Sequence, residues 1–114
     1  MNDIMGILEN KILVIKIKER DPEAFAKMYD FYVEKIYRFV FFKVSSVEDA
    51  EDITSDAFLK AWKYLGKKDT EIRNLNSFLY QIARNLVIDF YRQRAQKETV
   101  SIDAQVNMYH ELPD

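Results

Sequence analysis

A chain of 114 residues is long enough for one domain with a single core, and its 48% hydrophobic and 14% aromatic residues exclude intrinsic disorder. The absence of cysteine excludes disulfide bonds and thiolate metal sites, and apolar runs far shorter than about 20 residues exclude a transmembrane helix. The formal net charge of −2 excludes neither a basic nor an acidic partner, because it sums segments of opposite sign. We expect a soluble cytoplasmic protein without membrane insertion.

Apolar residues recur at intervals of three and four rather than two, which predicts an all-α fold, a compact bundle of about four helices. The first helix is predicted over roughly residues 8–19, after Gly6 interrupts the amino-terminal segment. The second is predicted to begin with Asp21 as N-cap and Pro22 at its first position. Its predicted buried stripe consists of Phe25, Met28, Tyr29, Tyr32, Ile36, Phe39 and Val40.

The third helix is predicted to start after Ser45 and Ser46, each with an acidic residue three positions later, and to have Gly66 as its C′ residue. Its predicted inward stripe is Ala50, Ile53, Thr54, Ala57, Phe58, Ala61 and Leu65. Its predicted outward residues are Glu48, Asp49, Asp52, Ser55, Asp56, Leu59 and Lys63. Such an acidic face is ordinarily only solvated, but Leu59 among the acids also suits a protein partner with a basic rim.

A polar loop over residues 66–76 is followed by a fourth helix that we expect to be capped by Asn74 or Asn76 and to run to about Ala95. Its predicted inward face is Phe78, Leu79, Ile82, Ala83, Leu86 and Phe90, and its other face carries Ser77, Tyr80, Gln81, Arg84, Asn85, Ile88, Tyr91 and Arg92. Cations, aromatic rings and amides are the groups that bind the phosphates and bases of single-stranded nucleic acid. The same tyrosines and arginines also suit half-buried and solubilising roles, and the residue pattern leaves both interpretations open.

The charge distribution supports two different partners. Residues 45–56 carry 5 acidic and 0 basic side chains, whereas residues 57–97 carry 9 basic and 3 acidic ones. No nucleophile-and-base pair, metal cluster or glycine-rich phosphate loop occurs, and the single histidine, His110, lies near the end of the chain. We therefore expect no catalytic residue, no bound metal and no cofactor, and a binding protein rather than an enzyme.

Three blocks in order, DPEAFAKMYDFYVEKIYRFVFFKV, EDAEDITSDAFLKAWKYL and NSFLYQIARNLVIDFYRQR, resemble region two of bacterial sigma-70 family factors, most closely the extracytoplasmic-function (ECF) group. Phe78 departs from the tryptophan of many members, and the loop lacks the aromatic cluster of primary sigma factors. The resemblance implies that residues 1–95 are the region two domain, with 1–9 as an extension of unassigned role. It implies that residues 96–114 begin an interdomain linker and that the second domain, which reads the minus-35 element, is absent.

The resemblance also implies two partners and the residues that bind them. In the family the acidic helix docks on the coiled coil of the RNA polymerase clamp, which implies contact through Asp49, Asp52, Asp56 and Leu59. In the family the loop and the start of the next helix capture the non-template strand of the promoter minus-10 element and so melt it, which implies the same role for these segments here. The implied DNA-binding residues are Lys67, Lys68, Arg73, Asn74, Asn76, Ser77, Tyr80, Arg84, Asn85 and Arg92. An anti-sigma factor is a further expected partner.

Two alternatives come from other classes. A helical protein-interaction module would bind polymerase or an anti-sigma factor through the acidic face and have no DNA activity. A helix-turn-helix regulator would prefer duplex DNA, but the polar loop over residues 66–76 is long for the turn of about 3–4 residues that this motif uses.

Overall fold

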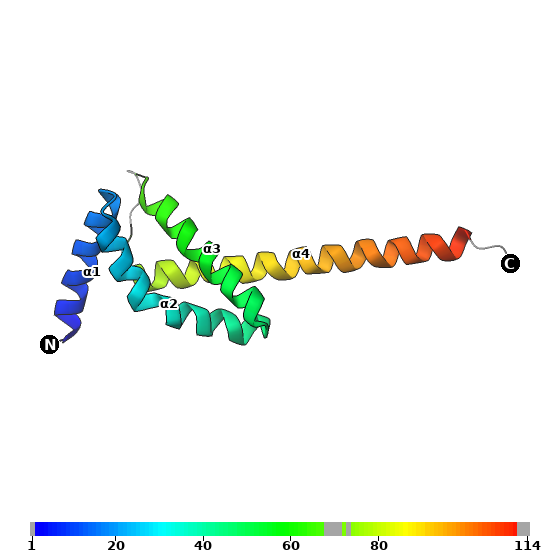
Figure 1. The fold of residues 1–114 in the computed structure, drawn as a ribbon, viewed down its shortest axis with the longest axis horizontal. Coiled ribbons are helices and arrows are strands. Elements are labelled where there is room, and N and C mark those ends of the chain that lie inside the picture. Colours follow the sequence, from blue (N-terminus) through cyan, green and yellow to red (C-terminus); the bar gives the residue numbers. More distant parts are fainter. Residues whose placement is uncertain (1, 68–71, 73, 112–114) are drawn as a thin grey trace.

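The described part of the chain folds as a bundle of four α-helices, α1 (Asn2–Lys18), α2 (Pro22–Val44), α3 (Val47–Leu65) and α4 (Leu75–Glu111) (Figure 1). The computed structural model describes the backbone of residues 2–67, 72 and 74–111, and the side chains of residues 8–67, 72 and 74–98. No strand occurs in these ranges, so the predicted all-α class is confirmed. Helix α1 packs on α2 and α3, and α4 packs against both α2 and α3.

Local sequence signals set most of the helix ends. Asp21 is extended and its carboxylate accepts a hydrogen bond of 3.0 Å from the Glu23 N–H, while Pro22 opens α2, as predicted. Ser45 closes α2 in the left-handed conformation, and the Ser46 hydroxyl accepts from the Asp49 N–H at the start of α3. Of the two serines with an acidic residue three positions later, Ser46 is therefore the N-cap of α3, which contributes about 1 kcal/mol to helix stability.

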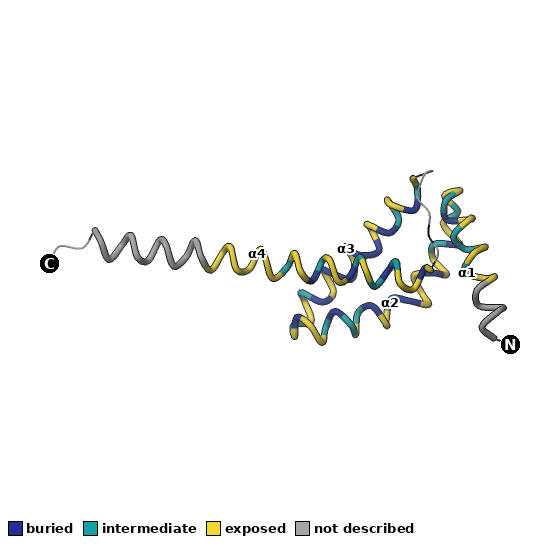
Figure 2. The backbone as a smooth tube through the Cα atoms, turned by 180° about the vertical axis from the view of Figure 1, so that it is seen from behind, coloured by how far each residue is buried: buried dark blue, intermediate teal, exposed yellow. Residues whose placement is uncertain are grey.

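The core lies where α2, α3 and α4 cross (Figure 2). The predicted inward stripe of α3 is confirmed at every position, since its buried residues are Ala50, Ile53, Thr54, Ala57, Phe58, Ala61 and Leu65. On α2, Met28, Tyr32, Ile36 and Val40 are buried as predicted. The prediction for Tyr29 was wrong, because this side chain is 42% exposed and rests its ring on the edge of the core, 4.9 Å from the ring of Phe58.

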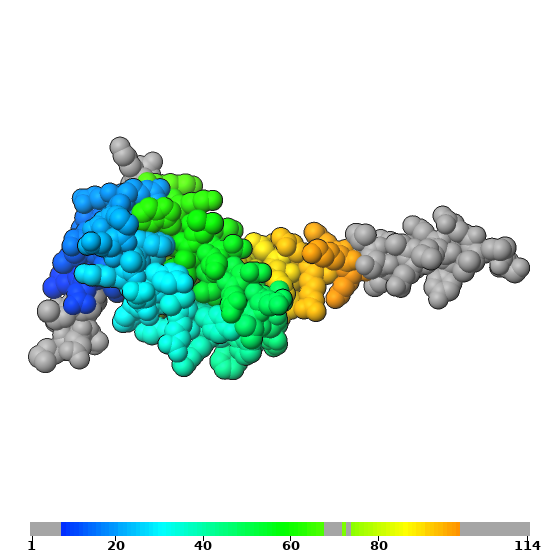
Figure 3. Space-filling view, viewed as in Figure 1, coloured from blue at the N-terminus to red at the C-terminus, as the bar shows by residue number. Residues whose placement is uncertain are grey.

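The lengths of α1 and α4 differ from the prediction. Helix α1 begins at Asn2 and passes through Gly6, so the predicted interruption was wrong, at a cost of about 1 kcal/mol for a helical glycine. Helix α4 continues past the predicted end at Ala95 to Glu111, because neither glycine nor proline occurs between Gly66 and Pro113 to stop it. Its distal part projects from the bundle and accounts for the long dimension of 75 Å (Figure 1). The coloured part of α4 already extends beyond the other helices in the space-filling view (Figure 3).

Candidate functional site

The acidic face of α3 consists of Asp49, Asp52 and Asp56, which the structure brings together. Asp52 and Asp56 are exposed and Asp49 is half-buried. With residues of α4 they line a groove of about 360 Å³, whose full lining is Asp49, Asp52, Ile53, Asp56, Lys60, Leu86, Asp89, Phe90 and Gln93. Within the described part of the chain, neither Asp52 nor Asp56 has a hydrogen bond or ion pair through its side chain. These two carboxylates are therefore available to an external cation.

Leu59, 52% exposed, lies on a different groove from these acids. That groove, about 390 Å³ in volume and almost wholly apolar, lies between α2 and α3 and is lined by Pro22, Phe25, Tyr29, Phe58, Leu59 and Trp62. Exposed apolar surface of this kind marks protein interfaces. Sequence reasoning missed Trp62 and Tyr29 as members of this surface, although Trp62 follows Leu59 at a spacing of three and so shares its side of the helix.

The polar face of α4, together with the chain just before it, carries most of the predicted DNA-binding residues. Lys67, Asn74, Asn76, Ser77, Arg84, Asn85 and Arg92 are exposed, and Tyr80 is half-buried. The predictions for Lys68 and Arg73 fall outside the residues that the structure describes. Ser77, Tyr80, Arg84, Ile88 and Tyr91 recur at intervals of three and four, so they share one side of the helix as predicted.

Hydrogen bonds order the side chains of this polar face. Arg84 Nη1 donates to Gln81 Oε1 at 3.1 Å, and Gln81 Nε2 donates to Asn85 Oδ1 at 3.1 Å. Asn74 caps α4, because its Oδ1 accepts from the Ser77 N–H at 3.0 Å, which settles the choice between Asn74 and Asn76. The Asn74 amide nitrogen still has two protons to donate to another group.

Tyr80 and Tyr91 connect the polar face of α4 to α2. The Tyr80 ring lies edge-on to Phe39 at 5.2 Å, and the Tyr91 hydroxyl donates to the backbone carbonyl of Lys43. The Lys43 ammonium group lies 5.1 Å from the centroid of the Phe39 ring. Lys43 thus adds a cation beside these aromatic residues, and sequence reasoning missed it because it belongs to a helix distant along the chain.

Among the described titratable side chains, Tyr32 is the one whose pKa departs clearly from its ordinary value. Burial raises the pKa of its phenol, a hydrogen bond with the Asn10 side chain opposes this rise, and nearby Tyr80 adds to it. Tyr80 is half-buried and packs against the core, while Arg84 and Asn85 of the same helix are exposed.

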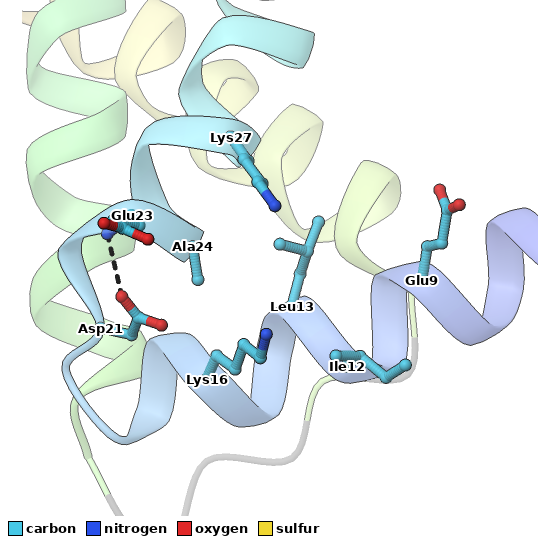
Figure 4. Close-up of a pocket in the computed structure, with 8 residues that line it drawn as sticks. All are labelled: Glu9, Ile12, Leu13, Lys16, Asp21, Glu23, Ala24 and Lys27. Carbon is cyan, nitrogen blue, oxygen red and sulfur yellow. Dashed lines mark hydrogen bonds between the residues drawn. The ribbon is translucent and has the colours of Figure 1, made fainter.

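A further groove between α1 and α2 contains none of the predicted site residues (Figure 4). Lys16 and Lys27 extend toward it, and carboxylates of Glu9, Asp21 and Glu23 line it as well, so its charges are mixed. No cluster of metal-ligating side chains occurs among the described residues. In the same part of the chain, no helix is both long and apolar enough to span a bilayer.

Comparison with known proteins gives one consistent result. The family model described as Sigma-70 region 2 matches residues 28–97. The chain is 35% identical over 80 residues to the ECF RNA polymerase sigma factor BldN of Streptomyces coelicolor, covering 70% of this chain and 30% of BldN. It is 37% identical over 91 residues to the ECF RNA polymerase sigma factor SigW of Bacillus subtilis, covering 80% of this chain and 47% of SigW.

A solved structure is also similar. One chain of the RsbN–BldN complex matches with a TM-score of 0.62 and 34% identity, over 70% of this chain and 58% of that chain. The chain thus spans less than half the length of the curated relatives BldN and SigW.

Proposed function

The chain belongs to the sigma-70 region 2 family, and from that premise we propose that it joins RNA polymerase to a melted promoter as part of an ECF sigma factor. In this proposal α3 binds the clamp coiled coil through Asp49, Asp52, Asp56 and Leu59. The loop after α3 and the start of α4 capture the non-template strand of the minus-10 element. The activity consists of binding alone and needs no catalytic residue or cofactor.

One observation carries the proposal: neighbouring helices of one bundle present surfaces of opposite chemistry. On α3, Asp52 and Asp56 are exposed on one groove and the exposed Leu59 lies on a second groove of the same helix, a combination that suits a basic protein partner with an apolar contact. On α4, Arg84, Asn85 and Arg92 are exposed along one side of a helix. Guanidinium and amide groups supply the phosphate and base contacts that a single strand requires.

Promoter melting follows from binding one strand in preference to the duplex. Separating DNA costs about 1–2 kcal/mol of stacking for each base-pair step. A surface that binds only unstacked bases returns part of this cost, so binding favours the open state. Cations such as Lys67 and Arg92 then supply salt-dependent affinity, and any pocket for a base supplies selectivity of about 1–3 kcal/mol.

A regulatory protein partner is part of the proposal. The similar chain BldN occurs in a solved complex with RsbN, which supports a second protein ligand for a domain of this shape. The predicted anti-sigma factor would have to cover the α3 surface or the polar face of α4 to prevent initiation. The predicted cytoplasmic location and the linker role of residues 96–114 remain predictions.

The hydrogen bonds on α4 favour a second candidate, a protein-interaction module without DNA activity. Gln81 is paired with both Arg84 and Asn85, so part of the polar face satisfies itself without any ligand. The helix-turn-helix alternative is disfavoured, because residues 66–74 separate α3 from α4.

The test uses the whole 114-residue chain and two ligands. One is a fragment that carries the clamp coiled coil. The other is a panel of fluorescein-labelled single strands of oligo(dT), about 12 nucleotides long, in which the central positions are replaced one at a time by each of the other bases. Binding to each strand is measured at about 50 mM and at about 200 mM salt. We expect binding to both ligands, base preference within the panel, and single-strand affinity that falls steeply with salt.

Two results would contradict the proposal. Clamp binding without affinity for any single strand would identify the interaction module. Tighter binding to matched duplexes than to single strands would identify a duplex-binding regulator.

A further inference from the structure

Arg20 has an unusual backbone conformation for an arginine. Its φ of 65° lies in the left-handed region, where it ends α1: the Arg20 N–H donates to the Ile17 carbonyl at 2.9 Å and the Asp21 N–H to the Lys16 carbonyl at 3.0 Å. This pair of bonds is the Schellman motif, whose left-handed position is usually glycine because a Cβ is crowded there. A non-glycine residue in such a position indicates that its side chain has a role that compensates for the strain.

The Arg20 side chain reaches the far end of α3. Its Cζ lies 4.5 Å from the centroid of the Trp62 ring, and its Nη1 donates to the Trp62 carbonyl at 3.0 Å. The Trp62 carbonyl also accepts a hydrogen bond from the Gly66 N–H at 3.2 Å, so the guanidinium donates a second bond to it while it lies over the indole. Arg20 therefore holds the last turn of α3 by two contacts with one residue.

Gly66 lies directly against the Arg20 guanidinium. Its φ of −74° is an ordinary right-handed value that any residue can adopt, so the backbone does not require glycine. A Cβ at Gly66 would lie 2.0 Å from Arg20 Nη2 and 2.2 Å from Arg20 Cζ, far inside van der Waals contact. The missing side chain of Gly66 thus makes the space that the guanidinium occupies.

We propose that Arg20 is a positioning residue for single-strand capture, an inference that rests on the proposed function. By holding Trp62 and filling the space at Gly66, it fixes the point at which the chain leaves α3 toward α4. Lys67, a proposed phosphate contact, follows this point directly, and Asn74 fixes the other end of the connection by capping α4. Arg20 itself touches no DNA in this proposal, and it lies outside the set of residues that the family resemblance implies.

The test compares Arg20→Gly, Arg20→Lys, Gly66→Ala and the double variant Arg20→Gly/Gly66→Ala with the wild-type chain. Arg20→Gly removes the side chain and relieves the backbone strain. Gly66→Ala leaves the arginine in place but expels its flexible guanidinium from the occupied space. The primary measurement is the discrimination ratio, defined as the dissociation constant of the weakest oligonucleotide of the panel divided by that of the tightest.

We expect Arg20→Gly and Gly66→Ala each to lower the discrimination ratio about tenfold, within the range that one mismatched base changes. The double variant should equal the single ones, because both substitutions remove the same contact. Arg20→Lys should resemble Arg20→Gly, since lysine keeps the charge but not the planar stack. Fluorescence of Trp62, the only tryptophan, should shift in all four variants, whereas unfolding temperature and clamp affinity should stay near wild type.

Three results would overturn the positioning role: an unchanged ratio in both single variants, additive losses in the double variant, or a wild-type ratio in Arg20→Lys, which would show that a positive charge at this position is sufficient and the planar stack on Trp62 is not needed. Failure of the proposed function is recognised separately. A wild-type chain that binds no single strand, or binds all of them equally, refutes that function and this inference with it.

Discussion

The outward faces of α3 and α4 differ in how far the protein itself occupies them. On α3, Asp52 and Asp56 have no partner through their side chains within the described chain. On α4, by contrast, Arg84, Gln81 and Asn85 are joined by hydrogen bonds. One face is therefore free and the other is already ordered.

This difference suggests two modes of recognition. Free carboxylates gain new partners without losing old ones, so a basic protein surface can bind α3 at little internal cost. An ordered set of amides and guanidinium groups loses less side-chain entropy on binding but must exchange some internal hydrogen bonds for contacts with bases. The α3 contact should therefore depend on charge, and the α4 contact on geometry as well as charge.

The largest expected effect is on the free face. Replacing Asp52 and Asp56 together by lysine should weaken binding to the clamp coiled coil by more than about 100-fold, because attraction becomes repulsion. The unfolding temperature should change little, since neither carboxylate has a partner among the residues that the structure describes. Isothermal titration calorimetry and thermal unfolding measure the two quantities.

A matched control separates the face from net charge. Glu9 and Asp30 are also exposed and lie on other helices, and their double replacement by lysine changes the net charge equally. Clamp affinity should survive in that control. Equal losses in both double variants would mean that α3 has no special part in the contact.

The ordered face is tested at Arg84 and Gln81. Arg84→Ala should lower the affinity for the tightest-binding single strand of the panel about tenfold, which corresponds to the loss of roughly one charge-assisted contact. Clamp binding should not change. Gln81→Ala leaves the guanidinium in place but removes the group that orients it. We expect an intermediate loss there, measured by fluorescence anisotropy, with Asn76→Ala as a further variant of the predicted base contacts.

The control for this pair is Glu34→Ala. It releases Arg38 from an exposed ion pair on α2 and so frees an arginine away from the polar face of α4. Single-strand affinity should not change in this variant. If Gln81→Ala binds as tightly as wild type, then the hydrogen bonds on α4 contribute nothing to recognition and the contrast with α3 disappears.

The same contrast explains what the sequence could reveal. The buried stripe of α3 was predicted at every position because a regular helical period determines which side faces the core. The exposure of Tyr29 and the position of Lys43 depend on how neighbouring helices cross, which the spacing of apolar residues within one helix cannot predict. The end of α4 was missed because no residue before Pro113 stops a helix. Gly66 was predicted as the C′ residue of α3, but its φ of −74° does not require glycine, and the space that it leaves is occupied by Arg20, 46 positions earlier along the chain.

A smaller effect is expected from Lys67, which lies between the two faces and whose ammonium is 5.8 Å from the centroid of the Tyr64 ring. Lys67→Ala should lower the affinity for all single strands of the panel by a similar factor, because a contact with a phosphate does not distinguish one base from another. It should also reduce the slope of log affinity against log salt by about 0.7. Anisotropy titrations over a range of salt concentrations measure this slope. A loss confined to a few oligonucleotides would identify Lys67 as a base contact instead.

The smallest expected effect concerns the point where α4 meets the core. Burial raises the pKa of Tyr32, so the folded chain keeps this proton at a pH where the unfolded chain has lost it. The resulting stabilisation is complete below the ordinary tyrosine pKa of about 10 and is lost as pH rises through the folded value. Tyr32→Phe should therefore weaken the decline of stability at alkaline pH, measured by urea unfolding at several pH values.

Tyr80 adds to this rise from the polar face of α4. Tyr80→Phe should lower the pKa of Tyr32 and shift the alkaline decline in the same direction as Tyr32→Phe, but less. Tyr29→Phe, a change at an exposed tyrosine of α2, should not. If the alkaline profile of Tyr80→Phe matches those of Tyr29→Phe and the wild-type chain, then Tyr80 does not contribute to the raised pKa of Tyr32. The ordering of the α4 face would then depend only on the hydrogen bonds along the helix itself.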